Sequence, residues 1–192
     1  MKKNILLIAL ALSTTFVSAF ASAQSANESY FGAALGRTKW NFDCSGAEHC
    51  STASASFKIF GGYSFSENLA IEGSYIYVNE TDASDSDLKV AQNARGVDIA
   101  AVFKTPAKNN FLGFAKVGAA FMKGEAVAAS GNFSASATQY STQPLLGFGV
   151  LYQLDKKMSL RAEIDSRRVK VTGFAGTTSR VMNYSFGFQS EF

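Results

Sequence analysis

The sequence is poor in the residues on which most metal sites and catalytic sites depend. Its 192 residues include one histidine, two cysteines and two prolines. A single histidine and two cysteines six positions apart make a poor set of metal ligands, so we expect no metal and no other cofactor. The scarcity of proline, beside 17 phenylalanines, seven tyrosines and 16 glycines, favours aromatic β-strands joined by polar loops.

The chain also lacks an excess of charge of one sign. The formal net charge is +3, and two of the basic residues, Lys2 and Lys3, lie at the extreme N-terminus. Without them the charge falls to about +1, which gives no basic surface suited to nucleic acid. We therefore exclude nucleic acid as a partner.

A long apolar run is missing as well. The N-terminal run from Ile5 to Leu12 is interrupted at Ser13, well before the roughly 20 residues that a membrane-anchoring helix needs. Basic residues precede the run, and the small residues Ala21 and Ala23 follow it, as in a secretory signal peptide. We predict a signal peptide at residues 1–23 and one exported domain at residues 24–192, with no further periplasmic domain.

What is present is an alternation of apolar and polar side chains. It is clearest at the C-terminus, where aromatic residues are separated by small or polar ones: Tyr184, Phe186, Phe188 and Phe192. A period of two predicts a β-strand whose two faces meet different media. With its aromatic face towards lipid, the segment is the closing strand of an outer-membrane barrel. In barrels of this type these aromatic residues form the insertion signal, and the barrel-assembly machinery is the partner that reads it.

Eight segments show this alternation: 30–39, 57–65, 69–78, 94–105, 111–122, 140–154, 158–169 and 180–192. Each has about the 9 to 11 residues with which a tilted strand crosses a bilayer. Short connections at 66–68, 106–110 and 155–157 alternate with longer ones at 40–55, 79–93, 123–139 and 173–179. Periplasmic turns and outer loops alternate in the same way. We predict an all-β fold, an eight-stranded antiparallel up-and-down transmembrane β-barrel in the bacterial outer membrane.

A soluble lipocalin-like barrel would have the opposite arrangement, with its apolar face inside and its charges outside. Alternation alone does not separate the two barrels. The predicted signal peptide, the charges on the polar face and the aromatic C-terminus all favour the membrane barrel.

Several segments resemble the OmpA-type transmembrane domain. Residues 94–106 (ARGVDIAAVFKTP), 114–118 (FAKVG), 144–152 (PLLGFGVLY) and 160–163 (LRAE) are similar to its fourth to seventh strands, and residues 30–36 (YFGAALG) to its first strand. The chain is thus identified as a member of the OmpA-like and OmpX-like family of eight-stranded outer-membrane barrels, the small porin-family barrels that include adhesion proteins.

The polar face of the predicted barrel carries five acidic and five basic residues: Lys58, Glu72, Asp98, Lys104, Lys116, Arg161, Glu163, Asp165, Arg167 and Glu191. An eight-stranded barrel has room for side chains and little more, and buried charges persist when they are paired. The favoured interpretation is therefore a charge-balanced core that fills the lumen. A lumen that conducts water, ions or small solutes is the alternative.

The family resemblance implies a lumenal Glu-Arg pair that exchanges partners with a nearby lysine and glutamate. Glu72 and Arg161 stand at the positions of the pair, whereas Val102 and Leu151 stand at the positions of the exchange partners. Two apolar residues offer the charges no new partner, so we expect no exchange of ion pairs.

The first outer connection contains both cysteines and the histidine. Cys44 and Cys50 are predicted to form a disulfide, because exported proteins meet an oxidising compartment. Two free thiols are the alternative, and thiol labelling of the unreduced protein distinguishes them. His49 and Ser51 place a base near a hydroxyl nucleophile, but no predicted strand holds them close to lipid, so we predict no enzymatic activity.

The outer connections are where a binding function is expected. Four acidic residues either attract divalent cations between lipopolysaccharide phosphates or keep the second connection solvated: Glu80, Asp82, Asp85 and Asp87. Four basic residues near the outer strand ends fit contact with outer-membrane lipids and lipopolysaccharide: Lys39, Lys123, Arg168 and Lys170. We predict a structural and surface-interaction protein whose loops meet host-surface ligands, with a narrow pore as the alternative.

Overall fold

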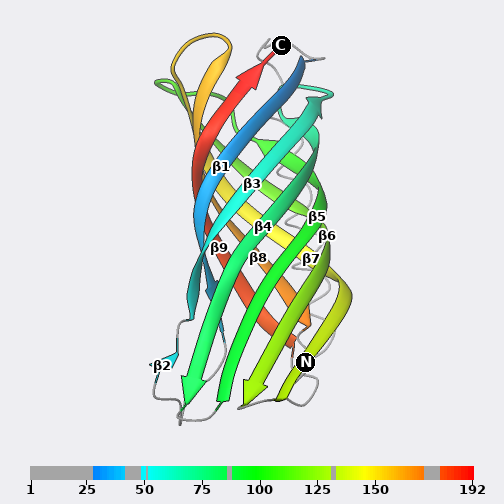
Figure 1. Cartoon of the computed structure of the whole chain (residues 1–192). Coiled ribbons are helices and arrows are strands. Elements are labelled where there is room, and N and C mark those ends of the chain that lie inside the picture. The colour runs from blue at the N-terminus through cyan, green and yellow to red at the C-terminus, as the bar shows by residue number, and fades with distance from the viewer. Residues whose placement is uncertain (1–27, 42–48, 51, 86–87, 131–132, 171–177) are drawn as a thin grey trace, which may run out of the picture.

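The structure is a computed structural model that describes residues 28–41, 49–50, 52–85, 88–130, 133–170 and 178–192. In this part of the chain, eight long antiparallel strands close into one barrel (Figure 1). They are β1 (Glu28–Trp40), β3 (Ala53–Ser64), β4 (Leu69–Asp85), β5 (Leu88–Lys104), β6 (Phe111–Ser130), β7 (Phe133–Gln153), β8 (Met158–Lys170) and β9 (Thr178–Glu191). A short strand, β2 (His49–Cys50), pairs with the outer end of β4. None of the described segments is a helix long and apolar enough to cross a membrane.

The register of the strands shows how steeply they are tilted. One row of neighbouring residues runs through Glu28, Ser64, Ala70, Val102, Lys116, Gly147, Asp165 and Asn183, and returns to β1 at Thr38. From Glu28 to Thr38 the row has advanced ten residues along β1. A stagger of this kind goes with a strand tilt of about 35–45°. Side chains that meet across the lumen therefore come from different rows of the sheet.

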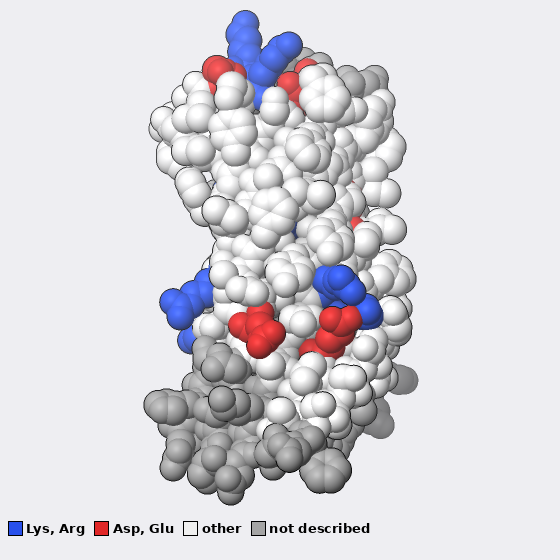
Figure 2. Space-filling model, in the orientation of Figure 1, with Lys and Arg blue, Asp and Glu red and all other residues white. Residues whose placement is uncertain are grey.

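Exposure alternates along the strands as the sequence predicts. On β9, Tyr184 and Phe186 are 42% and 59% exposed, whereas the neighbouring Asn183 and Ser185 are buried. On the other strands, too, large apolar side chains occupy the outward positions of the uncharged band, and the charged side chains at that level point inward. Figure 2 shows an uncharged band between a charged zone at the top of the barrel and a second one towards its lower end. This surface confirms the membrane barrel and not the lipocalin-like one.

All eight predicted strands are present, but two of the predicted long connections are wrong. Residues 79–93 and 123–139 are mostly strand, because β4 and β5 continue to Asp85 and Leu88, and β6 and β7 continue to Ser130 and Phe133. Small and polar residues make these segments resemble loops in the sequence. Outside the bilayer such residues still pair in an antiparallel ladder, since neither face has to meet lipid.

A β-bulge marks the start of one of these extensions. The β4–β5 register shifts between Val78 and Thr81, which places one extra residue on β4. The bulge reverses the parity of the strand. Thr81 is therefore buried at 3% exposure, although the alternation of 69–78 continued without a break would place it outside.

The turns at the opposite end are tight, as predicted. Asn109 and Asn110 have φ values of 51° and 67°, and Lys108 and Phe111 exchange both backbone hydrogen bonds at 2.8 and 3.0 Å. Two consecutive positive φ angles define the type I′ turn that fits the twist of a hairpin. This end carries Glu28 and Phe192, the first and last residues of the described barrel, and is the end that the sequence predicts to face the periplasm.

Two apolar layers fill the lumen on either side of its centre. The outer layer consists of Trp40, Ile76, Val78, Ala94, Ala100, Ala120, Met122, Leu145, Val169 and Val181. The layer nearer the periplasmic end consists of Tyr30, Ala34, Phe60, Ala70, Val102, Leu112, Phe114 and Leu151. The barrel interior is thus a packed core in the sense of a soluble protein, with its charges enclosed between two apolar layers.

Removal of Phe192 is expected to reduce the amount of folded protein in the outer membrane. Its backbone exchanges hydrogen bonds with Ser29 at 2.9 and 3.1 Å, and its ring is 72% exposed, so the deletion removes one closing contact and one aromatic. Phe192→Ala keeps the backbone contact, and Phe192→Tyr also keeps an aromatic ring. The folded fraction in outer-membrane preparations measures the effect, and a deletion variant that assembles as well as the wild type would contradict the expectation.

Candidate functional site: the charged lumen

Eight charged residues predicted for the lumen point inward and are buried, none of them more than 3% exposed. They come from five strands: Lys58 on β3, Glu72 on β4, Asp98 on β5, Lys116 on β6, and Arg161, Glu163, Asp165 and Arg167 on β8. Four acids face four bases, so this lumen charge cluster is balanced. β8 supplies half of it because its alternation places a charge at every inward position from 161 to 167.

The predicted pair of Glu72 and Arg161 forms, and its geometry is bidentate. Arg161 donates from Nη1 to Glu72 Oε2 at 2.7 Å and from Nη2 to Oε1 at 3.1 Å. The planar guanidinium also lies between two rings, with its central carbon 4.2 Å from the centroid of Phe60 and 4.4 Å from that of Phe114. Parallel N–H bonds and aromatic stacking are the two interactions that arginine makes and lysine does not.

Glu72 has two further donors besides Arg161. The Tyr30 hydroxyl donates to Oε2 at 3.0 Å, and Lys116 Nζ donates to Oε1 at 3.1 Å. Arg161 in turn donates from Nε to Glu163 at 2.8 Å and from Nη1 to Gln189 at 3.1 Å. This half of the cluster therefore satisfies its buried charges with several hydrogen bonds each, as a dry site requires.

The expectation that the Glu72–Arg161 pair lacks alternative partners is wrong. Val102 and Leu151 do stand in the apolar layer nearer the periplasm, but Lys116 contacts both Glu72 and Glu163, and Glu163 contacts Arg161. A lysine and a glutamate thus reach the pair from other positions. Sequence comparison by position missed them, because the stagger of the barrel decides which inward residues meet.

Inward glycines are the signal that would have pointed to these contacts. A Cβ atom at Gly147 would lie 2.5 Å from Asp165 Oδ1 and 3.0 Å from Lys116 Cε, and one at Gly149 would collide with the ring of Phe114. The two β7 glycines therefore leave room for the large side chains of the neighbouring strands β6 and β8.

The outer half of the cluster is less completely paired. Lys58 donates to Glu163 at 2.6 Å and to Asp165 at 3.1 Å, and Arg167 donates from Nη2 to Asp98 at 2.9 Å and to Asp165 at 3.2 Å. Arg167 Nε and Nη1 have no hydrogen-bond partner among the described residues. Arg167 therefore depends on fewer protein contacts than Arg161 does.

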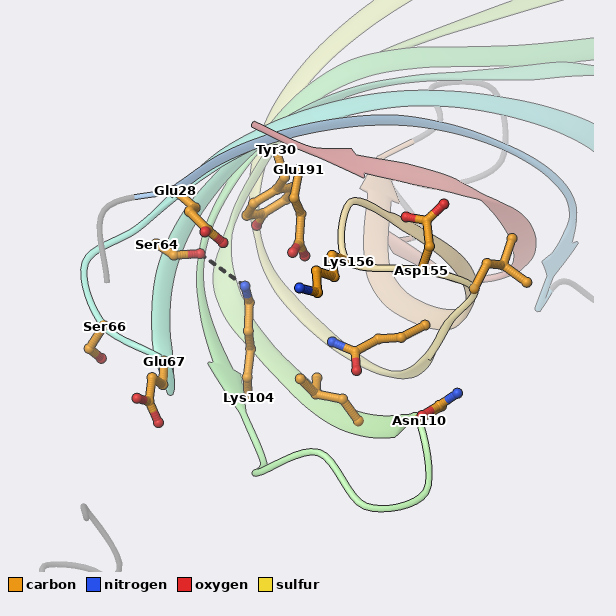
Figure 3. A pocket seen from close by; sticks show the side chains of 13 residues that line it. Glu28, Tyr30, Ser64, Ser66, Glu67, Lys104, Asn110, Asp155, Lys156 and Glu191 are labelled. Carbon is orange, nitrogen blue, oxygen red and sulfur yellow. Dashed lines mark hydrogen bonds between the residues drawn. The ribbon is translucent and has the colours of Figure 1, made fainter. Parts of the chain in front are cut away.

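The remaining two predicted lumen charges, Lys104 and Glu191, line a cavity of about 410 Å³ at the periplasmic mouth (Figure 3). Lys104 Nζ donates to Ser64 at 2.9 Å and lies 5.0 Å from the centroid of the Tyr30 ring. Tyr30 and Leu112 are buried at the inner side of this cavity. The cavity is the open end of the lumen. Further inside, the side chains of the apolar layer nearer the periplasmic end fill the barrel.

Several predicted site residues lie outside what the structure describes. Cys44 and the side chains of His49 and Cys50 are among them, as are those of Asp82, Asp85, Asp87 and Lys170. The disulfide, the acidic connection and the Lys170 contact therefore stay predictions. The aromatic residues of the insertion signal lie on the lipid-facing side of β9 and at its end.

The chain is similar to one protein family in sequence and to several solved outer-membrane barrels in structure. A family model described as the OmpA-like transmembrane domain matches residues 24–169. The outer membrane protein OprG from Pseudomonas aeruginosa has a TM-score of 0.61 at 10% sequence identity, covering 88% of this chain and 98% of that chain. Ail, the attachment invasion locus protein of Yersinia pestis, has a TM-score of 0.58 at 17% identity, covering 88% and 100%.

Neisserial surface protein A (NspA) has a TM-score of 0.57 at 16% identity, covering 89% of this chain and 100% of that chain. No curated protein matches the sequence. At these identities the solved structures show the fold alone.

Arg161→Met is expected to destabilise the barrel by about 3–5 kcal/mol, because it leaves Glu72 and Glu163 with fewer buried partners. Glu72→Gln alone should also destabilise it, since Arg161 and Lys116 lose a shared carboxylate. The double variant restores the charge balance and should cost less than the two single effects added together. Denaturant unfolding in lipid vesicles measures the coupling, and strictly additive effects would show that the two side chains do not act as a pair.

Proposed function

Because the chain belongs to the family of OmpA-like transmembrane domains, which are barrels of the bacterial outer membrane, we propose that it is a filled membrane anchor carrying a projecting sheet. The sheet, formed by the outer ends of β4, β5, β6 and β7, contacts surfaces outside the cell. No catalytic step and no cofactor are assigned to it. Outer-membrane lipids surround the barrel, and the barrel-assembly machinery inserts it.

The length of the outer strand ends supports the projecting sheet. Lys123 on β6 lies opposite Arg95 and Tyr140, at the level where charged side chains begin on the outer surface. Beyond this row β6 continues to Ser130, which at about 3.3 Å per residue adds roughly 25 Å of strand. In Figure 1 the strands labelled β4 to β7 extend to the lower end of the barrel.

The observation that carries the proposal is a strand edge at residues 134–138 of β7, which has no strand partner on the side away from β6 among the described residues. In that part of the chain, β7 pairs with β8 from Leu146 to Gln153, whereas its pairing with β6 continues out to Phe133. Pro144 stands where the pairing with β8 has stopped, and proline has no N–H to donate to a ladder. Residues 134–138 beyond it are mostly exposed and uncharged. They lack the lysines that usually protect an edge strand.

An open, uncharged edge fits an extended protein segment that adds a strand to the sheet. Ail has been solved in complex with the heparin analogue sucrose octasulfate, a highly charged ligand. The described part of the projecting β7 segment offers such a ligand no cation. We therefore favour a protein segment on a host or neighbouring surface as the partner of this edge.

Replacing residues 124–139 by an Asn-Gly turn between Lys123 and Tyr140 is expected to abolish attachment while the barrel still assembles. The β6–β7 ladder within the membrane is kept, and Asn-Gly suits a two-residue hairpin. Adhesion of cells that display each variant to an epithelial monolayer measures the effect at equal surface amounts. Cells with the trimmed variant should attach no better than cells without the protein.

Two lysine substitutions provide matched variants for this test. Ala135→Lys places a charge on the edge strand, whereas Val127→Lys places it on β6, which is paired on both sides. Only the first should reduce attachment, because only an edge can add a strand. Full attachment by the trimmed variant, or an equal loss from both lysines, would contradict the role of the β7 edge.

The pore alternative is tested by conductance. The lumen charge cluster is enclosed by the two apolar layers, and nine of the ten residues of the outer layer are at most 3% exposed, so we expect wild-type protein in planar bilayers to give rare openings or none. Trp40→Ala with Leu145→Ala should increase the frequency of openings by removing two large members of that layer. Frequent stable openings of the wild type would favour the pore.

A further inference from the structure

Four basic side chains lie next to one another on the outward face of β1, β9 and β8. Arg168 and Arg180 are direct register partners on β8 and β9. On the neighbouring strand pair, Lys39 pairs with Met182 and Arg37 with Tyr184. Lys39 is therefore a diagonal neighbour of Arg180, and Arg37 lies two residues from Lys39 on the same face of β1, nearer the periplasmic end. All four side chains are exposed. We call Arg37, Lys39, Arg168 and Arg180 the rim cations.

Neighbours on one face of a sheet are close enough for these charges to interact. Directly opposed residues have Cβ atoms about 4.5–5.5 Å apart, and diagonal neighbours about 7–8 Å. Two like charges that stand directly opposite each other, as in Arg168 and Arg180, destabilise the strand pair. An anion placed between them would remove that repulsion.

No acidic side chain within the described residues forms an ion pair with any rim cation. The other side of the barrel differs at the same level. There Glu125 lies 3.3 Å from Arg95 and 2.5 Å from Lys123, so those basic residues carry their own counter-charge. Within the described part of the chain, the rim cations thus form a surface of one sign, which an anion would complement.

The position of the rim cations identifies the medium that they meet. On the same strands the outward side chains nearer the periplasm are apolar, with Leu35, Ile164 and Phe186 being 70%, 43% and 59% exposed. Arg37, Arg168 and Arg180 are the first outward-facing charged residues beyond this apolar surface on β1, β8 and β9. This is the depth of lipid headgroups in the outer leaflet.

We propose that the rim cations form a binding site for the phosphate groups of a phosphorylated lipid in the outer leaflet. Two guanidinium groups provide paired N–H donors that match phosphate oxygens, and Lys39 and Arg37 extend the site along β1. The long side chains keep their apolar stems on the barrel surface while their charged ends reach the headgroups. This site rests on the membrane placement of the barrel and is independent of the β7 edge. Sequence alternation identified Lys39 and Arg168 as headgroup contacts but not Arg37 or Arg180.

The test measures binding of diphosphorylated lipid A to the purified full-length chain in detergent, by native mass spectrometry. Arg168→Gln with Arg180→Gln should weaken binding about 10- to 30-fold, from the loss of two cations at a headgroup. Arg95→Gln removes an exposed arginine that already has a carboxylate partner and should leave binding unchanged. Arg37→Gln with Lys39→Gln gives a second, independent pair should the first fail to fold.

Lipid A from which both phosphates have been removed should bind the wild type as weakly as intact lipid A binds the double variant. Equal binding of the two lipids, or an equal loss from Arg95→Gln, would overturn the site. Displacement of lipid A by soluble heparin at equal phosphate and sulfate concentrations would overturn the assignment to lipid. Loss of cell attachment in the trimmed β6–β7 variant has no bearing on these outcomes, so the two proposals fail separately.

Discussion

Backbone hydrogen bonding in a medium without water is the constraint on which the rest of this structure depends. Every N–H or C=O left unpaired in hydrocarbon costs several kcal/mol, so the sheet has to close, and β1 pairs with β9 along 11 positions from Tyr30 to Trp40. Closure with eight strands and a stagger of ten residues fixes a narrow lumen. The charged residues that alternation places inside therefore have to pack against one another and not against water.

The lumen charge cluster shows how that packing is achieved. Arg161 lies between two aromatic rings and shares two carboxylates with Lys116. Because several partners contact each charge, no single pair carries the whole balance. The apolar layers on either side exclude solvent and strengthen these electrostatic contacts. A cluster of this kind stabilises one arrangement of the strands, which fits a filled membrane anchor better than a conducting pore.

Outside the membrane, backbone groups can bond to water, so strands there need not be paired on both sides and charged side chains can face outward. Water satisfies an unpaired strand edge, so β7 can continue beyond its pairing with β8. Charged side chains appear on the outer surface where the apolar band ends. On β1, β8 and β9 they are all basic, and on β5 and β6 they include their own carboxylate. The two features proposed for recognition, the β7 edge and the rim cations, thus lie outside the hydrocarbon region, where water can satisfy unpaired polar groups.

The sequence by itself determined the strands within the membrane and the side of the sheet on which each residue lies. Alternation is a local property of the backbone, so Lys58, Glu72 and Arg161 are inward wherever their strands stand. Only the tertiary structure decided that Lys116 and Glu163 join the Glu72–Arg161 pair, and that Arg180 faces Arg168. Those contacts depend on register and stagger, and the inward side chain of Thr81 depends on the bulge after Val78. Register, stagger and bulge all arise when distant strands pair around a closed barrel.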